Sequence, residues 1–211
     1  MAAHTIALLG TGIMGAGMGR SMLREGLAVR AWNRTTAKAE PLADGGATVC
    51  AEAEEAVRGA QVIVTMLTDT DAVIEVADRV LDGAEDGAVW LQMSTIGVEG
   101  SDRAAEVASR HGVTLVDAPV SGTREPAEAG KLVVLASGPE SARAACAPVL
   151  DAVGGRTVWL GEEVGKGKPH EDGGQRLAPR PDRRARGNRR IGRGLGAGPE
   201  RLSHGDRGRA P

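Results

Sequence analysis

A glycine-rich loop near the start of the chain has the spacing of a dinucleotide-binding site. Gly10, Gly12 and Gly15 follow a short apolar run and open a segment with helical periodicity. In such a loop the first glycine permits a tight turn, the second lets a pyrophosphate approach the backbone, and the third lets helix and strand pack. The N–H groups at the helix start favour an anion. The loop, with Ile13 and Met14 at its variable positions, predicts a cofactor site; the alternative is a purely structural turn.

The residues that follow the second apolar run, 28–32, should contact the adenine ribose of the cofactor. An acidic residue there would bind the 2′-hydroxyl of NAD, whereas a nearby arginine suits the 2′-phosphate of NADP. The sequence supplies Asn33, Arg34 and Thr35 and no carboxylate. We therefore expect NADP, with NAD as the second possibility; Arg34 as an ordinary surface arginine is the alternative interpretation.

A second group of residues that could bind a ligand lies in the string DAPVSGTREPAEAGKL. Ser121 and Gly122 follow an apolar run, and ligands of open α/β sheets bind beyond the carboxyl ends of strands. A serine hydroxyl with exposed loop N–H groups could hold a small carboxylate. Taken alone, however, a string of Pro, Ser and Gly is also typical of a simple turn.

The segments that must position these residues alternate between two periodicities. Short runs rich in β-branched and aliphatic residues are typical of buried parallel strands, and the longer amphipathic stretches between them indicate helices. This alternation predicts an α/β fold, a Rossmann-type doubly wound and mostly parallel sheet. The predicted strands are 5–9, 28–32, 61–67, 88–93, 113–119, 131–137 and 156–160, and the predicted helices are 13–25, 36–44, 52–58, 71–82, 99–111 and 140–152.

Five short motifs, taken together, resemble those of a known family. The chain carries GTGIMG at 10–15, WNRT at 32–35, ML at 66–67, STIG at 94–97 and DAPVSG at 117–122. Their order and spacing resemble the β-hydroxyacid dehydrogenases, which include 3-hydroxyisobutyrate dehydrogenase, tartronate semialdehyde reductase and 6-phosphogluconate dehydrogenase. The resemblance covers about residues 4–167. Imine reductases share the nucleotide loop but are less similar at DAPVSG.

The resemblance implies roles for further residues. Met66 and Leu67 would line the cofactor pocket, and Thr95 would contact the nicotinamide end. Ser121 and Gly122 would bind the carboxylate of a short 3-hydroxy acid or semialdehyde, which would exchange a hydride with the cofactor. Thr123 stands where the family usually has a second glycine, and its side chain should crowd this substrate loop.

The family's catalytic residues are not found where the resemblance places them. A lysine normally acts as general acid and base, and an asparagine follows it in a Gly-x-Gly-x-x-x-Lys-x-x-x-Asn pattern. The chain has the two glycines at 165 and 167, but Glu171 and Gln175 occupy the next two positions of the pattern. The resemblance therefore implies either an oxidoreductase or a non-catalytic NADP-binding remnant that lacks the family's all-α second domain.

The composition changes at about residue 167. Residues 1–167 hold 14 Lys and Arg against 23 Asp and Glu, a net charge of −9, whereas residues 168–211 hold 12 against 5, a net charge of +7. We expect an NAD(P)-binding domain over 1–167 and a disordered basic segment over 168–211. Nucleic-acid binding by this basic segment is a remote alternative, because it has no aromatic residue to stack on bases.

A shift of reading frame explains the basic segment better. Codons for residues 168–178 can be chosen so that the frame displaced by one base reads Ser-Arg-Met-Lys-Met-Val-Val-Asn-Ala-Trp. That frame restores the lysine and the asparagine at the family's spacing. We therefore predict that translation of this segment is out of frame.

The remaining composition excludes several classes of protein. Cys50 and Cys146 form no disulfide framework or metal-binding pattern, and the four histidines show no metal spacing, so we expect no metal. The apolar run HTIALLG is too short for a signal peptide or a membrane span. We expect a soluble cytoplasmic protein with a small carboxylate-bearing substrate. The resemblance also implies dimers, built by the second domain.

Overall fold

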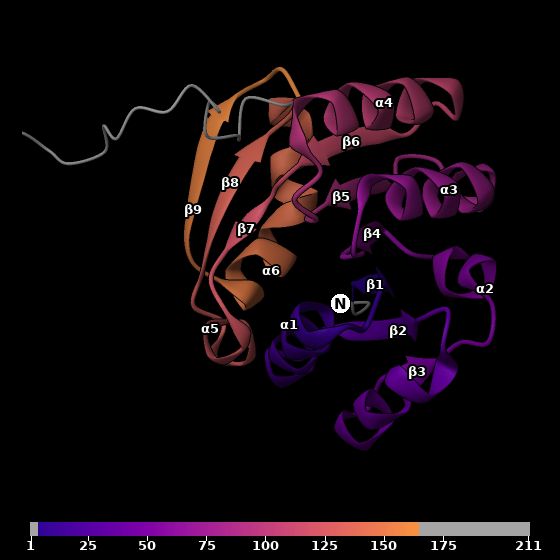
Figure 1. Cartoon of the computed structure of the whole chain (residues 1–211), viewed down its shortest axis with the longest axis vertical. Coiled ribbons are helices and arrows are strands. Elements are labelled where there is room, and N and C mark those ends of the chain that lie inside the picture. The colour runs from indigo at the N-terminus through magenta and orange to yellow at the C-terminus, as the bar shows by residue number, and fades with distance from the viewer. Residues whose placement is uncertain (1–3, 165–211) are drawn as a thin grey trace, which may run out of the picture. The chain divides into compact units, whose positions relative to one another are not determined.

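A computed structural model describes residues 4–164 of the chain. Contacts divide the chain into Met1–Glu171 and Asp172–Pro211, and every described residue lies in the first unit. The described residues form one sheet with the strand order β3-β2-β1-β4-β5-β6-β8-β7, and β9 pairs with β8 (Figure 1). Because the order reverses between β1 and β4, this sheet has the switch point at which doubly wound folds bind ligands.

The first part of the sheet is parallel throughout and alternates with helices. Its strands are mostly apolar and mostly buried, as expected where helices cover both faces of a sheet. The elements are β1 (Thr5–Leu9), α1 (Ile13–Arg24), β2 (Ala28–Trp32), β3 (Thr48–Val49), α2 (Ala53–Val57), β4 (Val62–Thr65), α3 (Thr70–Val80), β5 (Val89–Gln92), α4 (Gly97–Arg110) and β6 (Thr114–Asp117).

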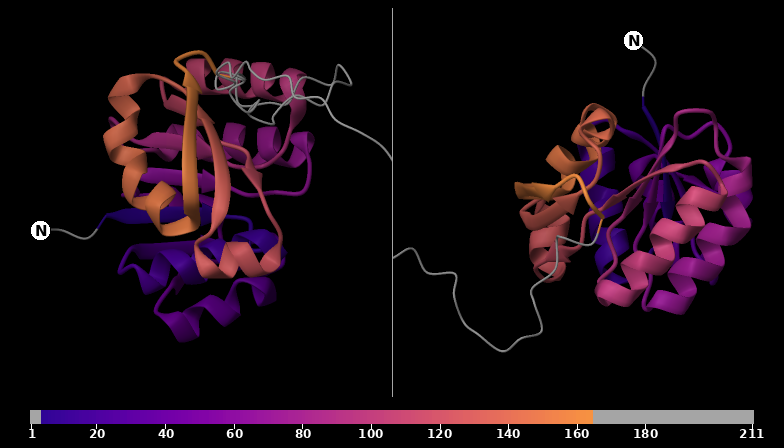
Figure 2. Two further views of the ribbon diagram at one scale, coloured as in Figure 1. Left: turned by 90° about the vertical axis from the view of Figure 1, so that its left-hand side faces the viewer. Right: turned by 90° about the horizontal axis from the view of Figure 1, so that it is seen from above.

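The second part of the sheet is mixed. Strand β8 pairs antiparallel with β6 and β7 and parallel with β9. Strands β7, β8 and β9 run steeply across the direction of the first part (Figures 1 and 2). The elements are β7 (Val120–Ser121), α5 (Arg124–Ala129), β8 (Leu132–Ser137), α6 (Arg143–Val153) and β9 (Gly154–Gly161).

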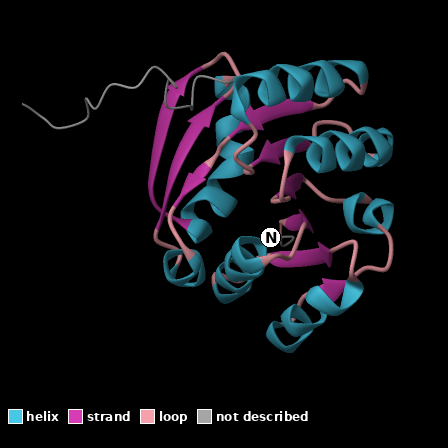
Figure 3. Cartoon of the chain, in the orientation of Figure 1, coloured by secondary structure: helices cyan, strands magenta, loops and turns pink. Residues whose placement is uncertain are grey.

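Helices cover both faces of the sheet, with one hydrophobic core on each side (Figure 3). One core joins α1, α5 and α6 to the sheet through residues such as Met18, Ala127 and Val149. The other packs α2, α3 and α4 around the buried Trp90. The 3.6-residue period of α3 predicts a core-facing stripe of Val73, Val76, Ala77 and Val80. Val73, Ala77 and Val80 are buried in this core, and Val76 packs against it partly buried.

The predicted fold class is confirmed, with differences in its short elements. Residues 36–44 form two 3₁₀ helices, η1 (Thr36–Lys38) and η2 (Glu40–Gly45), and not an α-helix. Pro41 stands in the first turn of η2, and Gly46 ends it with φ +97°. Three short elements were not predicted: β3, β7 and α5.

Candidate cofactor-binding site

The predicted cofactor residues lie in loops that leave the same edge of the sheet. Parallel strands β1, β2, β4 and β5 end at Leu9, Trp32, Thr65 and Gln92, and the candidate residues follow within a few positions. The strand ladder continues into these loops: the Gly10 N–H donates to Trp32 O at 2.9 Å, and the Met66 N–H donates to Leu9 O at 2.9 Å. The fold therefore gathers distant segments at one edge.

The three loop glycines meet different surroundings. A Cβ on Gly10, whose φ is +104°, would lie 2.3 Å from Met66 O. A Cβ on Gly15 would lie 2.0 Å from Gly10 O, so this glycine allows α1 to pack against the loop. A Cβ on Gly12 would meet nothing within 4 Å. Gly10 and Gly15 are thus required by packing, whereas the space at Gly12 is open to a ligand.

No side chain of the described residues occupies the N-terminus of α1 where an anion would bind. Gly12 is its N-cap, no side chain caps it, and no acidic residue stands in its first turn. The first N–H groups of a helix lack partners within the helix, and the helix dipole attracts negative charge to them. The exposed Ile13 and the half-buried Met14 begin the helix. This end is suited to a pyrophosphate.

Asn33 and Thr11 join the ends of β1 and β2. The Asn33 Oδ1 accepts from the Thr11 N–H at 3.1 Å, and its Nδ2 donates to Thr35 O at 3.1 Å. The side chain of Asn33 therefore holds the glycine loop in shape. The Thr11 hydroxyl is buried and has no partner among the described residues, so it is a polar atom that a bound ligand could satisfy. The loop spacing alone did not single out Thr11.

Arg34 lies on the surface beside the beginning of α3. Its side chain is exposed and makes no hydrogen bond or ion pair with any residue between 4 and 164. Asp69 has a pKa below its ordinary value, mainly because it accepts from the Ala72 and Thr68 groups, and the positive charge of Arg34 adds to this shift. Thr35 is exposed and is the N-cap of η1. The guanidinium is free to take an anionic partner.

The predicted lining residues of the pocket follow β4 and β5. Met66 and Leu67 are half-buried, and Met66 packs on the core beneath α1. Thr95 is exposed immediately after the buried Ser94. The Leu67 N–H donates to Ser94 Oγ at 2.9 Å, which links these two loops. Both loops thus present side chains at the edge of the sheet that carries the glycine loop.

The predicted substrate loop lies at the start of the mixed part of the sheet. Ser121, at the end of β7, is exposed. Gly122 has φ +148°, and a Cβ there would lie 2.6 Å from the Leu132 side chain, so a side chain would be strained. Thr123 is exposed and extended, with φ −120°. The extended backbone at Thr123 accommodates a side chain without strain, and crowding of the substrate loop by that side chain stays a prediction.

Helix α5 anchors this loop onto α1. Gly17 of α1 leaves room for α5, because a Cβ there would lie 3.0 Å from Ala127 Cβ. Glu128 accepts from Arg20 at 3.1 Å and from Arg124 at 3.0 Å. Helix α5 was missed because it is short, contains Pro126 and lies between Gly122 and Gly130, a pattern typical of a turn. The pair at positions 124 and 128, four residues apart, followed by Gly130 in the left-handed conformation, is the signal that could have revealed it.

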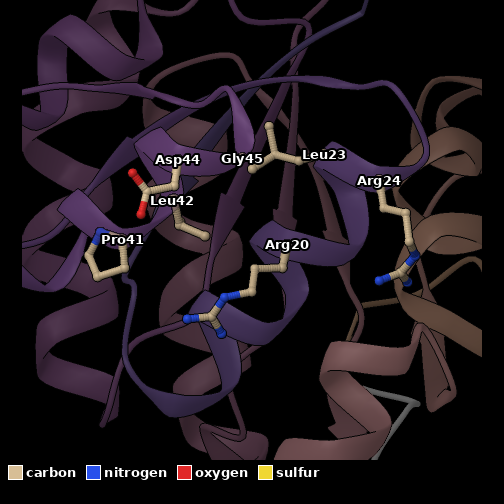
Figure 4. A pocket seen from close by; sticks show the side chains of 7 residues that line it. All are labelled: Arg20, Leu23, Arg24, Pro41, Leu42, Asp44 and Gly45. Atoms are coloured by element: carbon tan, nitrogen blue, oxygen red, sulfur yellow. The ribbon is translucent and has the colours of Figure 1, made fainter.

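A cavity of about 380 Å³ lies away from these loops, between α1 and η2 (Figure 4). Two arginines of α1 border it, and both are engaged elsewhere: Arg20 with Glu128, and Arg24 with Glu128 O at 3.0 Å and Ser21 Oγ at 2.7 Å. Its lining residues are Arg20, Leu23, Arg24, Pro41, Leu42, Asp44 and Gly45. This cavity contains none of the predicted site residues.

Other chemistry finds little support in the part of the chain that the structure describes. Cys50 and Cys146 are buried and unpaired, and burial raises the pKa of the Cys146 thiol to about 12, so it is a poor nucleophile. Between residues 4 and 164, no group of three His, Cys, Asp or Glu side chains could hold a metal ion. No helix in the same range is long and apolar enough to cross a membrane. Glu171 and Gln175 lie outside the described residues.

Comparison with known proteins agrees with this geometry. Residues 5–161 match the family described as the NAD binding domain of 6-phosphogluconate dehydrogenase. Glyoxylate/succinic semialdehyde reductase 1 of Arabidopsis thaliana is 36% identical over 165 residues, which are 77% of this chain and 57% of that protein. The chain thus spans little more than half the length of this relative.

Solved structures give the same result. The 3-hydroxyisobutyrate dehydrogenase of Mycobacterium tuberculosis with L-serine is 34% identical with a TM-score of 0.75, over 78% of this chain and 56% of that one. The imine reductase of Myxococcus stipitatus in complex with NADP+ is 28% identical with a TM-score of 0.71, over 77% and 57%. The chain therefore belongs to the β-hydroxyacid dehydrogenase family, whose members are NAD(P)-dependent oxidoreductases, and residues 5–161 form its NAD-binding domain.

Proposed function

We propose that this chain binds NADP at the loops after β1, β2, β4 and β5 and serves the oxidoreductase chemistry of its family. The observation that carries the proposal is the N-terminus of α1. It is uncapped and free of acidic residues, and its N-cap Gly12 leaves the space above the backbone open. A pyrophosphate there would accept hydrogen bonds from N–H groups that have no partner inside the helix.

The choice of NADP over NAD rests on Arg34. Its guanidinium is unpaired within the described residues, and no carboxylate follows β2 to accept the 2′-hydroxyl of NAD. A hydrogen bond between charged groups contributes roughly 1.5–3 kcal/mol, equivalent to about a tenfold to hundredfold preference. Thr35 and Asn33 would complete this end of the pocket, with Asn33 also holding the glycine loop through Thr11.

The nicotinamide end would lie beside Thr95 and the substrate loop. When bound, the cofactor accepts or donates a hydride at C4 of its nicotinamide ring. Ile13, Met14, Met66 and Leu67 would form the apolar walls that orient the cofactor and exclude water. The chain's own part in the reaction, on this proposal, is binding and orientation of two ligands.

The substrate class is a small 3-hydroxy acid or the corresponding semialdehyde. Ser121 offers an exposed hydroxyl, and Gly122 keeps the neighbouring backbone unobstructed by a side chain, an arrangement suited to a carboxylate. Two relatives support this class: one is named a glyoxylate/succinic semialdehyde reductase, and the other was solved with L-serine, which carries a carboxylate and a 3-hydroxyl.

A second candidate function is NADP binding without turnover. It is favoured by Glu171 and Gln175, which stand where the family pattern has lysine and asparagine. Loss of a general acid and base lowers a rate by about 10²–10⁴. An out-of-frame segment after residue 167 would account for both replacements. Codons for residues 168–178 that do not encode the lysine and asparagine in the displaced frame would exclude that explanation.

One pair of measurements separates these functions. The purified chain 1–211 is titrated with NADPH and is then assayed with NADP and a panel of small 3-hydroxy acids, with Ser121→Ala as the matched control. Turnover that depends on Ser121 supports the oxidoreductase, and saturable binding without turnover supports the second candidate. Absence of both overturns the proposal. Dimer formation and location in the cytoplasm stay predictions, and nucleic-acid binding by residues 168–211 stays a remote alternative.

A further inference from the structure

Three neighbouring parallel strands end in buried polar residues. Thr65, Gln92 and Asp117 are the last residues of β4, β5 and β6, and they are register partners: Thr65 opposite Gln92, and Gln92 opposite Asp117. All three are at most 1% exposed, and Asp117 is the single acidic or basic residue in the buried set of the described chain. Burial of polar groups at such a depth is unfavourable unless they are hydrogen-bonded.

The Gln92 side chain makes two hydrogen bonds with the backbone of Ser94, the residue before Thr95. Its Oε1 accepts from the Ser94 N–H at 2.7 Å, and its Nε2 donates to Ser94 O at 2.8 Å. These two bonds fix both peptide groups of Ser94. Because the second of these groups is the peptide bond that joins Ser94 to Thr95, the side chain of Gln92 sets the path on which Thr95 leaves the sheet.

Ser94 extends this arrangement to the preceding loop. Its Oγ accepts from the Leu67 N–H at 2.9 Å and lies 3.5 Å from Thr65 O. The Leu67 loop and the Thr95 loop are therefore held at a fixed separation by one buried hydroxyl. The two loops line the proposed cofactor pocket from neighbouring strands.

Asp117 completes the network from β6. Its Oδ1 accepts from Gln92 Nε2 at 3.1 Å, and its Oδ2 accepts from Ser101 Oγ of α4 at 2.9 Å. Ser101 in turn lies 3.3 Å from Gly97 O in the first turn of α4. The carboxylate thus orients the Gln92 amide so that its nitrogen faces Asp117 and Ser94 O, and its oxygen faces the Ser94 N–H. The same carboxylate ties α4 to the sheet.

We propose that Gln92, Ser94 and Asp117 act as a positioning clamp that aligns the Thr95 loop with the nicotinamide half of the cofactor. The proposal rests on the proposed function and adds residues that contact neither ligand. A buried amide and a buried carboxylate fix one geometry of the edge, because each alternative geometry leaves a buried polar group unpaired. The adenosine half, at Arg34 and Asn33, lies at the other strand ends and does not depend on the clamp.

The test compares Gln92→Met with Ser21→Ala in the full chain. Methionine has a similar length but makes neither bond to Ser94. Ser21 is also buried and donates to a backbone carbonyl, Ala152 O at 2.6 Å, but it lies on the other face of the sheet. Three quantities are measured for each variant: the Kd of NADPH, the Kd of 2′,5′-ADP as a probe of the adenosine half, and the midpoint of thermal unfolding.

We expect Gln92→Met to weaken NADPH by about tenfold, the effect of losing the positioning bonds, with 2′,5′-ADP changed less than about twofold because the adenosine half is unaffected. The emission spectrum of bound NADPH should also move towards that of the free cofactor. Ser21→Ala should lower the thermal midpoint without changing the ratio of the two affinities. An equal loss for both ligands, an unchanged NADPH affinity, or the same ratio change in Ser21→Ala would overturn the clamp.

A second variant and a second readout keep the proposal testable. If Gln92→Met does not fold, Asp117→Asn, which keeps the shape and removes the charge, is judged by the same ratio. If the unsubstituted chain binds neither ligand, the proposed function fails, and the clamp is then judged by amide hydrogen exchange. Faster exchange at Ser94 and Leu67 in Gln92→Met would support the clamp, and unchanged exchange at both would overturn it.

Discussion

Helices α1 and α3 begin at the same edge of the sheet, after the adjacent parallel strands β1 and β4, yet their N-termini differ. On α3, Asp69 caps the first turn by accepting from the Ala72 N–H at 2.9 Å, and Asp71 adds a second carboxylate. On α1, Gly12 caps with no side chain, and the first turn has no acid. One helix satisfies its own N–H groups, and the other leaves them for a ligand.

The difference shows what topology fixes and what it does not. A doubly wound sheet delivers several helix N-termini to one edge, and each is a potential anion site. The side chains at the first turn decide which of them is open. Here the glycine loop opens α1, and the carboxylates of α3 exclude an anion and place negative charge beside Arg34 instead.

A carboxylate at the start of α1 should give this helix the negative charge that α3 carries. Ile13 is 72% exposed, so Ile13→Glu should fold normally. A carboxylate near the pyrophosphate should weaken NADPH binding by about tenfold to a hundredfold through like-charge repulsion. Fluorescence titration measures the effect. Ile13→Gln has the shape of Ile13→Glu without its charge, and its NADPH affinity should stay within a few-fold of that of the native chain. An equal loss of affinity in both variants would show that charge is not the cause.

Two glycines of the loop have different roles, because Gly15 is required for packing and Gly12 faces the space for a ligand. In an ordinary helix, Gly→Ala stabilises by about 1 kcal/mol. Because a Cβ on Gly15 would lie 2.0 Å from Gly10 O, Gly15→Ala should instead destabilise the fold, by about 1–3 kcal/mol. Gly12→Ala should keep the stability and lose NADPH affinity. Urea unfolding with the matched titration distinguishes them, and a stabilised Gly15→Ala would contradict the packing described here.

The negative charge at the start of α3 also bears on Arg34. Arg34→Gln should lower the affinity for NADP by about tenfold or more, because the 2′-phosphate of NADP loses its ionic partner. The affinity for NAD, which has no 2′-phosphate, should change by less than about twofold. Competition titrations with both dinucleotides measure the ratio. Lys38→Gln, which removes a nearby exposed charge on η1, is the control. The same ratio change in the control would indicate a general effect of positive charge.

The smallest expected effect is on the pH dependence of stability, and it arises at the C-terminal ends of α3 and α4. His111, after α4, lies 3.0 Å from Asp78 and 2.5 Å from Asp82, and its pKa is raised from 6.5, first by the hydrogen bond with Asp78. Its contribution to stability is fully present below about pH 6.5 and is lost as the pH rises through the raised pKa. The pKa of Asp78 is lowered, so its contribution is lost only in acid.

Thermal unfolding across pH 6 to 9 should show this fall in stability in the native chain. His111→Gln should flatten the profile over that range, while NADPH affinity stays unchanged, since this end of α4 is remote from the glycine loop. A native profile that is already flat would contradict the ion pairs of His111.

Much of this architecture follows from local patterns in the sequence. Strands β1 and β2 occupy the predicted residues 5–9 and 28–32, because continuous apolar runs bounded by glycine and polar residues admit few alternatives. The glycine loop was equally clear, since Gly10 and Gly15 are dictated by local backbone geometry. The NAD-binding domain and its family were therefore predicted correctly from short motifs.

What the sequence did not reveal depends on contacts between distant segments. Helix α5 is held by Gly17 and Arg20 of α1, more than a hundred residues away. The polar network at Gln92 and Asp117 joins β5 to β6, and nothing in either strand marks these residues as partners. Such features become visible only once the register of the sheet is known.

Titration of the unsubstituted chain with NADPH, followed by competition with NADP and NAD, tests whether the loops after β1, β2, β4 and β5 bind NADP. We expect one saturable site per chain, displaced by NADP at lower concentration than by NAD, and lost in Ile13→Glu but not in Ile13→Gln. A folded chain that shows no saturable binding, or that binds NADPH equally in Ile13→Glu, would contradict it.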